Sequence, residues 1–122
     1  MSDYYHKKVL RYPVSKNELK EHGVNDVYDL IDSVKDYTGE YKIEAAPTYK
    51  PFIDLILFKD PFTSNGDFGY VRELNKEQQN KYKKYFEQYV PNIDMSKVHY
   101  VDFCWYNCSE APDYYEIEEL DI

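Results

Sequence analysis

The side chains that could support nucleophilic or metal chemistry are few and scattered. The sequence holds His6, His22 and His99, and the two cysteines Cys104 and Cys108. His99 with the cysteines is the best candidate set of metal ligands, but residues 99 and 104 point to opposite faces of an extended strand. A structural zinc site also needs a fourth ligand and closer cysteine spacing. The same parity argues against a Cys–His nucleophile pair, so we expect buried thiols and neither a metal nor a cofactor.

Sequence motifs of known catalytic chemistry do not occur in the chain. There is no H-E-x-x-H, P-loop, G-x-S-x-G or dinucleotide-binding fingerprint. Carboxylates lie near one another often, as an acidic composition requires, and no acid/base pair stands out by its spacing. We therefore expect a protein that is not an enzyme. The alternative is a small enzyme whose site forms only in the folded chain.

One group of carboxylates has a helical period. Asp29, Asp32 and Asp36 stand at positions i, i+3 and i+7 of a helix predicted from about Asn25 or Asp26 to Tyr37. They lie opposite the apolar positions Val27, Ile31 and Val34. Neighbouring Cβ atoms on such a stripe are about 5–6 Å apart, a spacing comparable to that of successive phosphates. The stripe, flanked by Asp26, predicts either a docking surface for a basic partner or a solvated helix face.

The C-terminal segment 110–122 is the second acidic feature. It holds six acidic side chains interleaved with Tyr114, Tyr115, Ile117 and Leu120. A merely solvating tail has little use for such residues, so the segment either packs back on the domain or docks on a partner. Its candidate partner-binding residues are Glu110, Asp113, Tyr114, Tyr115, Glu116, Glu118 and Glu119.

Length and charge limit the class of protein. The chain has 122 residues, enough for one domain spanning residues 1–122. A net charge of −8 argues against direct nucleic-acid binding. No apolar run is long enough for a membrane helix, and no signal peptide is visible. With only two cysteines, we expect reduced thiols and a cytoplasmic protein.

Residue periodicity and turn signals predict the elements that must position these side chains. Strands are expected at Tyr4–Val14, Tyr41–Ala46, Phe52–Phe58 and Val98–Tyr106, the last with Val101, Phe103 and Trp105 facing the core. Phe68–Arg72 is expected to pair back as a short extra strand. Capping boxes at Ser15 and Asn75 open two more helices, with Gly23 and Gly39 predicted at helix ends.

The order of these elements predicts an α+β fold. The string is β-α-β-β-(β)-α-β, which favours one antiparallel sheet with the helices packed on one face. A ferredoxin-like βαββαβ arrangement with an extra short strand fits it.

Phe68-Gly69-Tyr70-Val71 resembles the middle of the RNP1 motif of RNA-recognition-motif domains. In that family the aromatic side chains of the motif stack on bases. The match covers four residues, with Gly66-Asp67 before it and Glu73 at the last aromatic position, where the family pattern differs. We therefore interpret Phe68 and Tyr70 as ordinary strand residues.

In composition, the chain resembles the small acidic proteins of phages and mobile elements that block nucleases, including anti-CRISPR and anti-restriction proteins. That resemblance implies a DNA mimic, an inhibitor that occupies the basic site of a nuclease or another nucleic-acid-binding protein. Such an inhibitor binds a protein rather than nucleic acid or a membrane. The alternative of the same physical type is an immunity protein or antitoxin that neutralises a basic toxin.

Truncation after Ser109 tests the two roles of segment 110–122. If the segment covers the core, truncation lowers the free energy of unfolding by several kcal/mol, since each large apolar side chain contributes about 1.5–3 kcal/mol. If it serves a partner, stability is unchanged and binding weakens with part of its salt dependence lost. We predict a mixed result, with Tyr114 or Tyr115 on the domain and Glu116, Glu118 and Glu119 facing the partner. A truncated chain with native stability and native affinity contradicts both roles.

Overall fold

The computed structural model describes residues 4–46, 51–63 and 70–106, with side chains described at 6–46, 51–59 and 71–102. The elements, in chain order, are β1 (Tyr4–Pro13), α1 (Lys16–Glu21), α2 (Val27–Ser33), β2 (Lys42–Ala45), β3 (Phe52–Thr63), β4 (Tyr70–Glu73), α3 (Lys76–Phe86), the 3-10 turn η1 (Met95–Lys97) and β5 (His99–Tyr106).

The five strands form one antiparallel sheet in the order β2-β3-β1-β5-β4. With three helices added, this confirms the predicted α+β class. Without β4, the strand order and directions are those of the ferredoxin-like arrangement that the sequence suggested. The predicted pairing of β4 with the strand before it is wrong. Both sides of β3 are already occupied by β1 and β2, so β4 adds to the far edge, beside β5.

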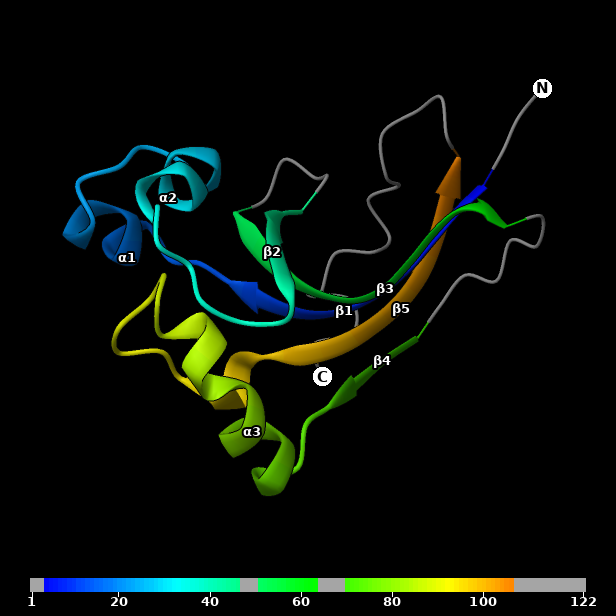
Figure 1. The fold of residues 1–122 in the computed structure, drawn as a ribbon. Helices are drawn as coiled ribbons and strands as arrows, with labels where there is room; N and C mark the ends of the chain where they lie inside the picture. The colour runs from blue at the N-terminus through cyan, green and yellow to red at the C-terminus, as the bar shows by residue number, and fades with distance from the viewer. Residues whose placement is uncertain (1–3, 47–50, 64–69, 107–122) are drawn as a thin grey trace.

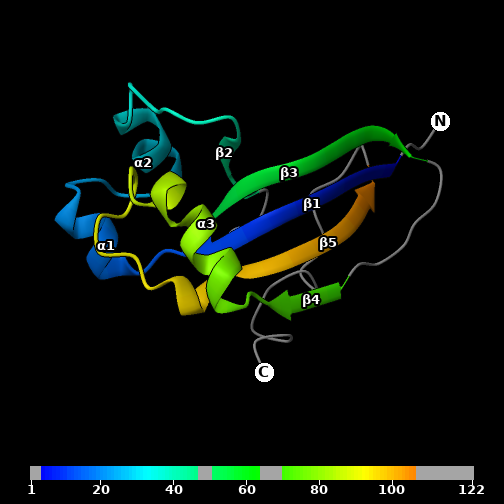
Figure 2. The ribbon, with the colours of Figure 1, turned by 60° about the horizontal axis from the view of Figure 1, so that its bottom comes forward.

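The helices lie on one face of the sheet and cover one end of it (Figures 1 and 2). The main core forms between this face and the helices. Leu10, Tyr12 and Leu55 from the sheet meet Leu30 of α2 and Phe86 of α3. Alternation along β1 sends every second side chain into this core, as the sequence predicted.

The opposite face of the sheet, here called the second face, carries a smaller apolar cluster of Val9, Ala46, Phe52 and Val101. Val101 was predicted to face the main core. It is buried, but it points away from the helices, and Val98 takes the place in the main core. Phe103 and Trp105, predicted to share its side, have side chains outside the described residues.

Local sequence signals set most helix ends. Both predicted capping boxes are present: Ser15 pairs with Glu18 at α1, and Asn75 with Gln78 at α3. Gly23 follows α1 with a φ of 68°, the left-handed conformation that glycine adopts without strain. These predictions are confirmed.

The second helix is shorter than predicted. It ends at Ser33 rather than Tyr37, and Val34 is already extended. The Ser33 hydroxyl donates to the Leu30 carbonyl, 2.7 Å away, and Val34 and Tyr37 then pack against the main core. The Thr38 N–H donates to the Gln88 side chain at 2.8 Å, and the Gln88 amide donates back to the Thr38 carbonyl at 2.7 Å. Tertiary packing therefore overrides the helical period here.

Gly39 is not a helix cap, since α2 ends six residues earlier. A Cβ at this position would lie 2.7 Å from the Tyr85 ring, which explains the need for glycine.

A fully buried ion pair lies at the centre of the second face. Arg11 of β1 donates from Nε to Asp54 Oδ1 at 2.7 Å and from Nη2 to Asp54 Oδ2 at 2.8 Å. Both side chains are 0% exposed, and the guanidinium also lies over the Phe52 ring, 5.1 Å from its centroid. The two-bond geometry ties β1 to β3 in a single register.

We predict that Asp54→Asn lowers the free energy of unfolding by about 3–5 kcal/mol, because it leaves a buried guanidinium without its counter-charge. The double variant Arg11→Met/Asp54→Leu should lose much less than the sum of the losses of Arg11→Met and Asp54→Leu, since it removes both charges of the pair and buried Lys7 keeps Glu44 as its partner. Urea denaturation measures both, with the exposed Asp32→Asn as control. A loss below about 1 kcal/mol for Asp54→Asn contradicts the role assigned to this pair.

Candidate functional site

The acidic residues predicted on the second helix are at the surface. Asp26, Asp29 and Asp32 are exposed, and so is Asp36. None of the four forms an ion pair within the described part of the chain. The carboxylates of Asp29, Asp32 and Asp36 are therefore available to an external cation.

Two of these aspartates differ from prediction in how they are placed. Asp36 lies beyond the end of α2, so the i, i+3, i+7 stripe is not continuous on one helix. Asp26 is the N-cap of α2, and its carboxylate accepts from the Asp29 N–H at 2.9 Å. Asp26 therefore has a structural role, worth about 1 kcal/mol, and only Asp29 and Asp32 lie on the helix as predicted.

An aromatic side chain stands among these carboxylates. Tyr28 of α2 is 58% exposed, more than Phe58, the other exposed large hydrophobic side chain in the described part. It precedes Asp29 and lies one helical turn before Asp32, so all three share the outer side of the helix. Exposed tyrosine is typical of interface hot spots. We call Tyr28, Asp29, Asp32 and Asp36 the acidic surface.

The remaining predicted partner-binding residues, Glu110, Asp113, Tyr114, Tyr115, Glu116, Glu118 and Glu119, lie outside the described residues. The same holds for Cys108 and for Phe68 of the RNP1-like segment.

A row of ionisable side chains crosses the whole second face. Strand register places Glu44 opposite Asp54, Asp54 opposite Arg11, Arg11 opposite His99, and His99 opposite Glu73. Directly paired residues share a face of an antiparallel sheet. The row therefore runs from β2 to β4 through the buried ion pair.

The Glu44 carboxylate at one end of the row is shared by three ammonium groups. Lys7 lies 3.3 Å away, Lys42 3.5 Å and Lys59 3.8 Å. Burial alone would raise the pKa of Glu44, but the three lysines outweigh burial and hold it below its ordinary value. Burial lowers the pKa of Lys7, against the opposing effect of Asp54 and Glu44.

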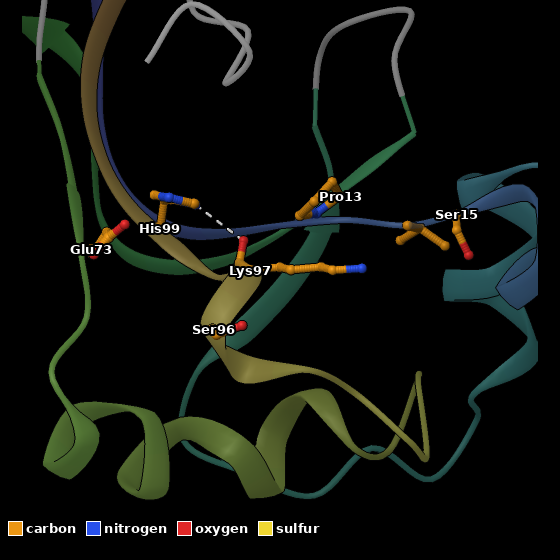
Figure 3. A pocket seen from close by; sticks show the side chains of 7 residues that line it. Pro13, Ser15, Glu73, Ser96, Lys97 and His99 are labelled. Carbon is orange, nitrogen blue, oxygen red and sulfur yellow. Dashed lines mark hydrogen bonds between the residues drawn. The ribbon is translucent and has the colours of Figure 1, made fainter. Parts of the chain in front are cut away.

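The other end of the row opens into a cleft of about 420 Å³ (Figure 3). Four segments form its wall: the connection from β1 to α1, the end of β4, the turn η1 and the start of β5. The lining residues are Pro13, Val14, Ser15, Glu73, Ser96, Lys97 and His99. Figure 3 shows Glu73 beside His99 at one end, and the Lys97 side chain extending toward Ser15 at the other.

Hydrogen bonds fix several of these polar groups. His99 Nδ1 lies 3.1 Å from the Lys97 carbonyl oxygen, so this nitrogen donates. The Ser96 hydroxyl donates to Asp94 at 2.6 Å, and the two hydrogen bonds from Ser96 lower the pKa of Asp94. Ser15 Oγ accepts from the Glu18 N–H at 3.1 Å, which leaves its hydroxyl proton for another acceptor.

Within the described ranges, no group of three or more His, Cys, Asp or Glu side chains could hold a metal ion. No helix among these residues is long and apolar enough to cross a membrane. Comparison with family models, with curated proteins and with solved structures finds no match to this chain. The functional argument therefore rests on the side chains themselves.

Sequence reasoning missed the ionic row, the cleft and Tyr28. The row depends on strand register, which joins residues from five separate strands, and no local pattern reports it. Tyr28 could have been found, because a helical projection places it one turn before Asp32 on the polar side.

We predict that Glu44→Gln lowers the free energy of unfolding at pH 7 by about 1 kcal/mol, because three ammonium groups lose their shared counter-charge. The pKa of Glu44 is depressed in the folded chain, so its stabilisation is complete above its ordinary value of 4.5 and is lost as the pH falls through the folded-state pKa. The difference between wild type and variant should therefore shrink below pH 4.5. Urea denaturation over a pH series measures it, with the exposed Glu87→Gln as control. A difference that stays constant down to pH 3 contradicts the assignment.

Proposed function

We propose that this protein is a non-enzymatic binding protein whose acidic surface occupies the basic site of another protein. The partner is a nuclease or another nucleic-acid-handling protein. The observation that carries the proposal is the exposure of Asp29 and Asp32 beside the 58% exposed Tyr28 on α2. Asp36, also exposed, follows the helix end, and none of the three aspartates forms an ion pair in the described part.

The physical basis is electrostatic attraction combined with an aromatic anchor. A groove that binds phosphates carries lysine and arginine side chains, which attract carboxylates fixed on a folded surface. Such attraction raises association rates and weakens steeply with salt. The Tyr28 ring adds contact area with few rotatable bonds, so little conformational entropy is lost on binding.

The cleft is the observation that favours the alternative of a small enzyme, because concave sites with convergent polar groups are the usual setting of catalysis. The hydroxyl of Ser96 and the ring of His99 both bind local structural partners. The Ser96 hydroxyl donates to Asp94, the N-cap of η1, and His99 Nδ1 donates to the Lys97 carbonyl oxygen. Neither hydrogen bond joins Ser96 to His99, and we therefore favour binding over catalysis.

We predict that the triple variant Asp29→Lys/Asp32→Lys/Asp36→Lys loses at least about tenfold in partner affinity at low salt, equivalent to 1.4 kcal/mol. Affinity purification from the source cells with mass spectrometry identifies the partner, and calorimetry then measures affinity. The fold should survive, because all three positions are exposed. Asp26 is left intact, because it caps α2.

The matched control is Glu21→Lys/Glu77→Lys/Glu87→Lys, at three exposed positions outside α2. Both triple variants change the net charge from −8 to −2, so loss of affinity in the first alone assigns binding to the acidic surface. Nucleic acid added to the complex should displace the protein. Equal affinity for the two triple variants, or a partner that binds nucleic acid and this protein together, contradicts the proposal.

Coexpression separates the inhibitor from the immunity protein. If the captured partner is toxic to the cell when expressed alone and harmless with this protein, the immunity or antitoxin alternative holds.

A further inference from the structure

We propose that the cleft binds a small zwitterion, a molecule with a carboxylate at one end and an ammonium at the other, such as a short peptide with free termini. This goes beyond the proposed function, because none of the residues of the acidic surface lines the cleft.

Size and shape are the first argument. A volume of about 420 Å³ falls within the range of roughly 300–1,000 Å³ that is typical of small-molecule sites. Four separate segments supply the wall, and several are fixed by hydrogen bonds. The Val14 N–H donates to the Pro51 carbonyl at 2.7 Å, and the Ser15 N–H to the Glu18 carboxylate at 2.8 Å. The cleft is therefore largely pre-formed.

The charges at its two ends are the second argument. The Lys97 ammonium has no hydrogen bond or salt bridge within the described part of the chain, and it acts on the Asp94 carboxylate only through space, lowering the pKa of Asp94. The Glu73 carboxylate likewise has no hydrogen bond or salt bridge among these residues. Figure 3 shows them directed to opposite ends, with the His99 ring between them. The Ser15 hydroxyl adds a donor at the Lys97 end.

This polarity selects the ligand class. A ligand with only a negative charge would pair with Lys97 but be repelled by Glu73. A ligand with only a positive charge would pair with Glu73 but be repelled by Lys97. A ligand with one charge of each sign satisfies both ends, with its carboxylate toward Lys97 and Ser15 and its ammonium toward Glu73. Blocking either end of the ligand should therefore weaken binding.

The test titrates the isotope-labelled protein with triglycine and follows amide shifts by NMR. We expect shifts confined to the cleft segments and a Kd on the order of 1 mM. N-acetyl-triglycine lacks the ammonium, and triglycine amide lacks the carboxylate. Each should bind at least about tenfold more weakly than triglycine.

Two variants assign the ends. Lys97→Met should remove the preference for triglycine over triglycine amide. Glu73→Gln should remove the preference for triglycine over N-acetyl-triglycine. Both positions are exposed, so the fold should be kept, and Lys84→Met and Glu77→Gln are matched exposed controls outside the cleft. Equal affinity for the three peptides, or shifts outside the cleft alone, overturns the proposal. The triple aspartate variant should bind triglycine normally, so failure here leaves the proposed function untouched.

Discussion

A guanidinium with no exposed surface needs an opposite charge beside it in the sheet, and this requirement organises the second face. Arg11 and Asp54 meet through two hydrogen bonds, at 2.7 and 2.8 Å. Removing either partner alone would leave a buried charge whose desolvation is not offset. Because the pair joins β1 to β3, a shift in register by one residue would break it and turn every side chain of one strand to the other face.

The ionic row needs two further registers beside that one. The pairing of β1 with β5 places His99 opposite Arg11, and the pairing of β4 with β5 places Glu73 opposite His99. The position of the cleft is thus a consequence of strand pairing, since its Glu73–His99 end is the end of the row. An element that stabilises the fold also positions the groups proposed to bind a ligand.

The two proposed sites differ in what holds them. The acidic surface needs only a short capped helix, and its like charges repel one another slightly unless a cation is near. That cost is small beside the buried contacts of Leu30 with the main core. The cleft depends on four segments and on the sheet register, so it is sensitive to core changes that would leave the acidic surface intact. A core substitution that disrupts the cleft should therefore leave the acidic surface intact.

The sequence by itself determined the element types, the α+β class, both capping boxes and the alternation of β1, because each depends on neighbours within a few residues. It also determined that Asp29 and Asp32 face outward, since they lie opposite the apolar positions of α2. Tertiary structure decided the end of α2, where Thr38 binds Gln88 from a distant segment. It decided the place of β4, because β1 and β2 already occupy both sides of β3. It also decided the direction of Val101, which pairs with Val9 of the second face. It alone brought together the ionic row and the cleft, whose residues are separated by as many as 88 positions in the chain, from Arg11 to His99. A hydrogen-bonded register over such distances leaves no local pattern.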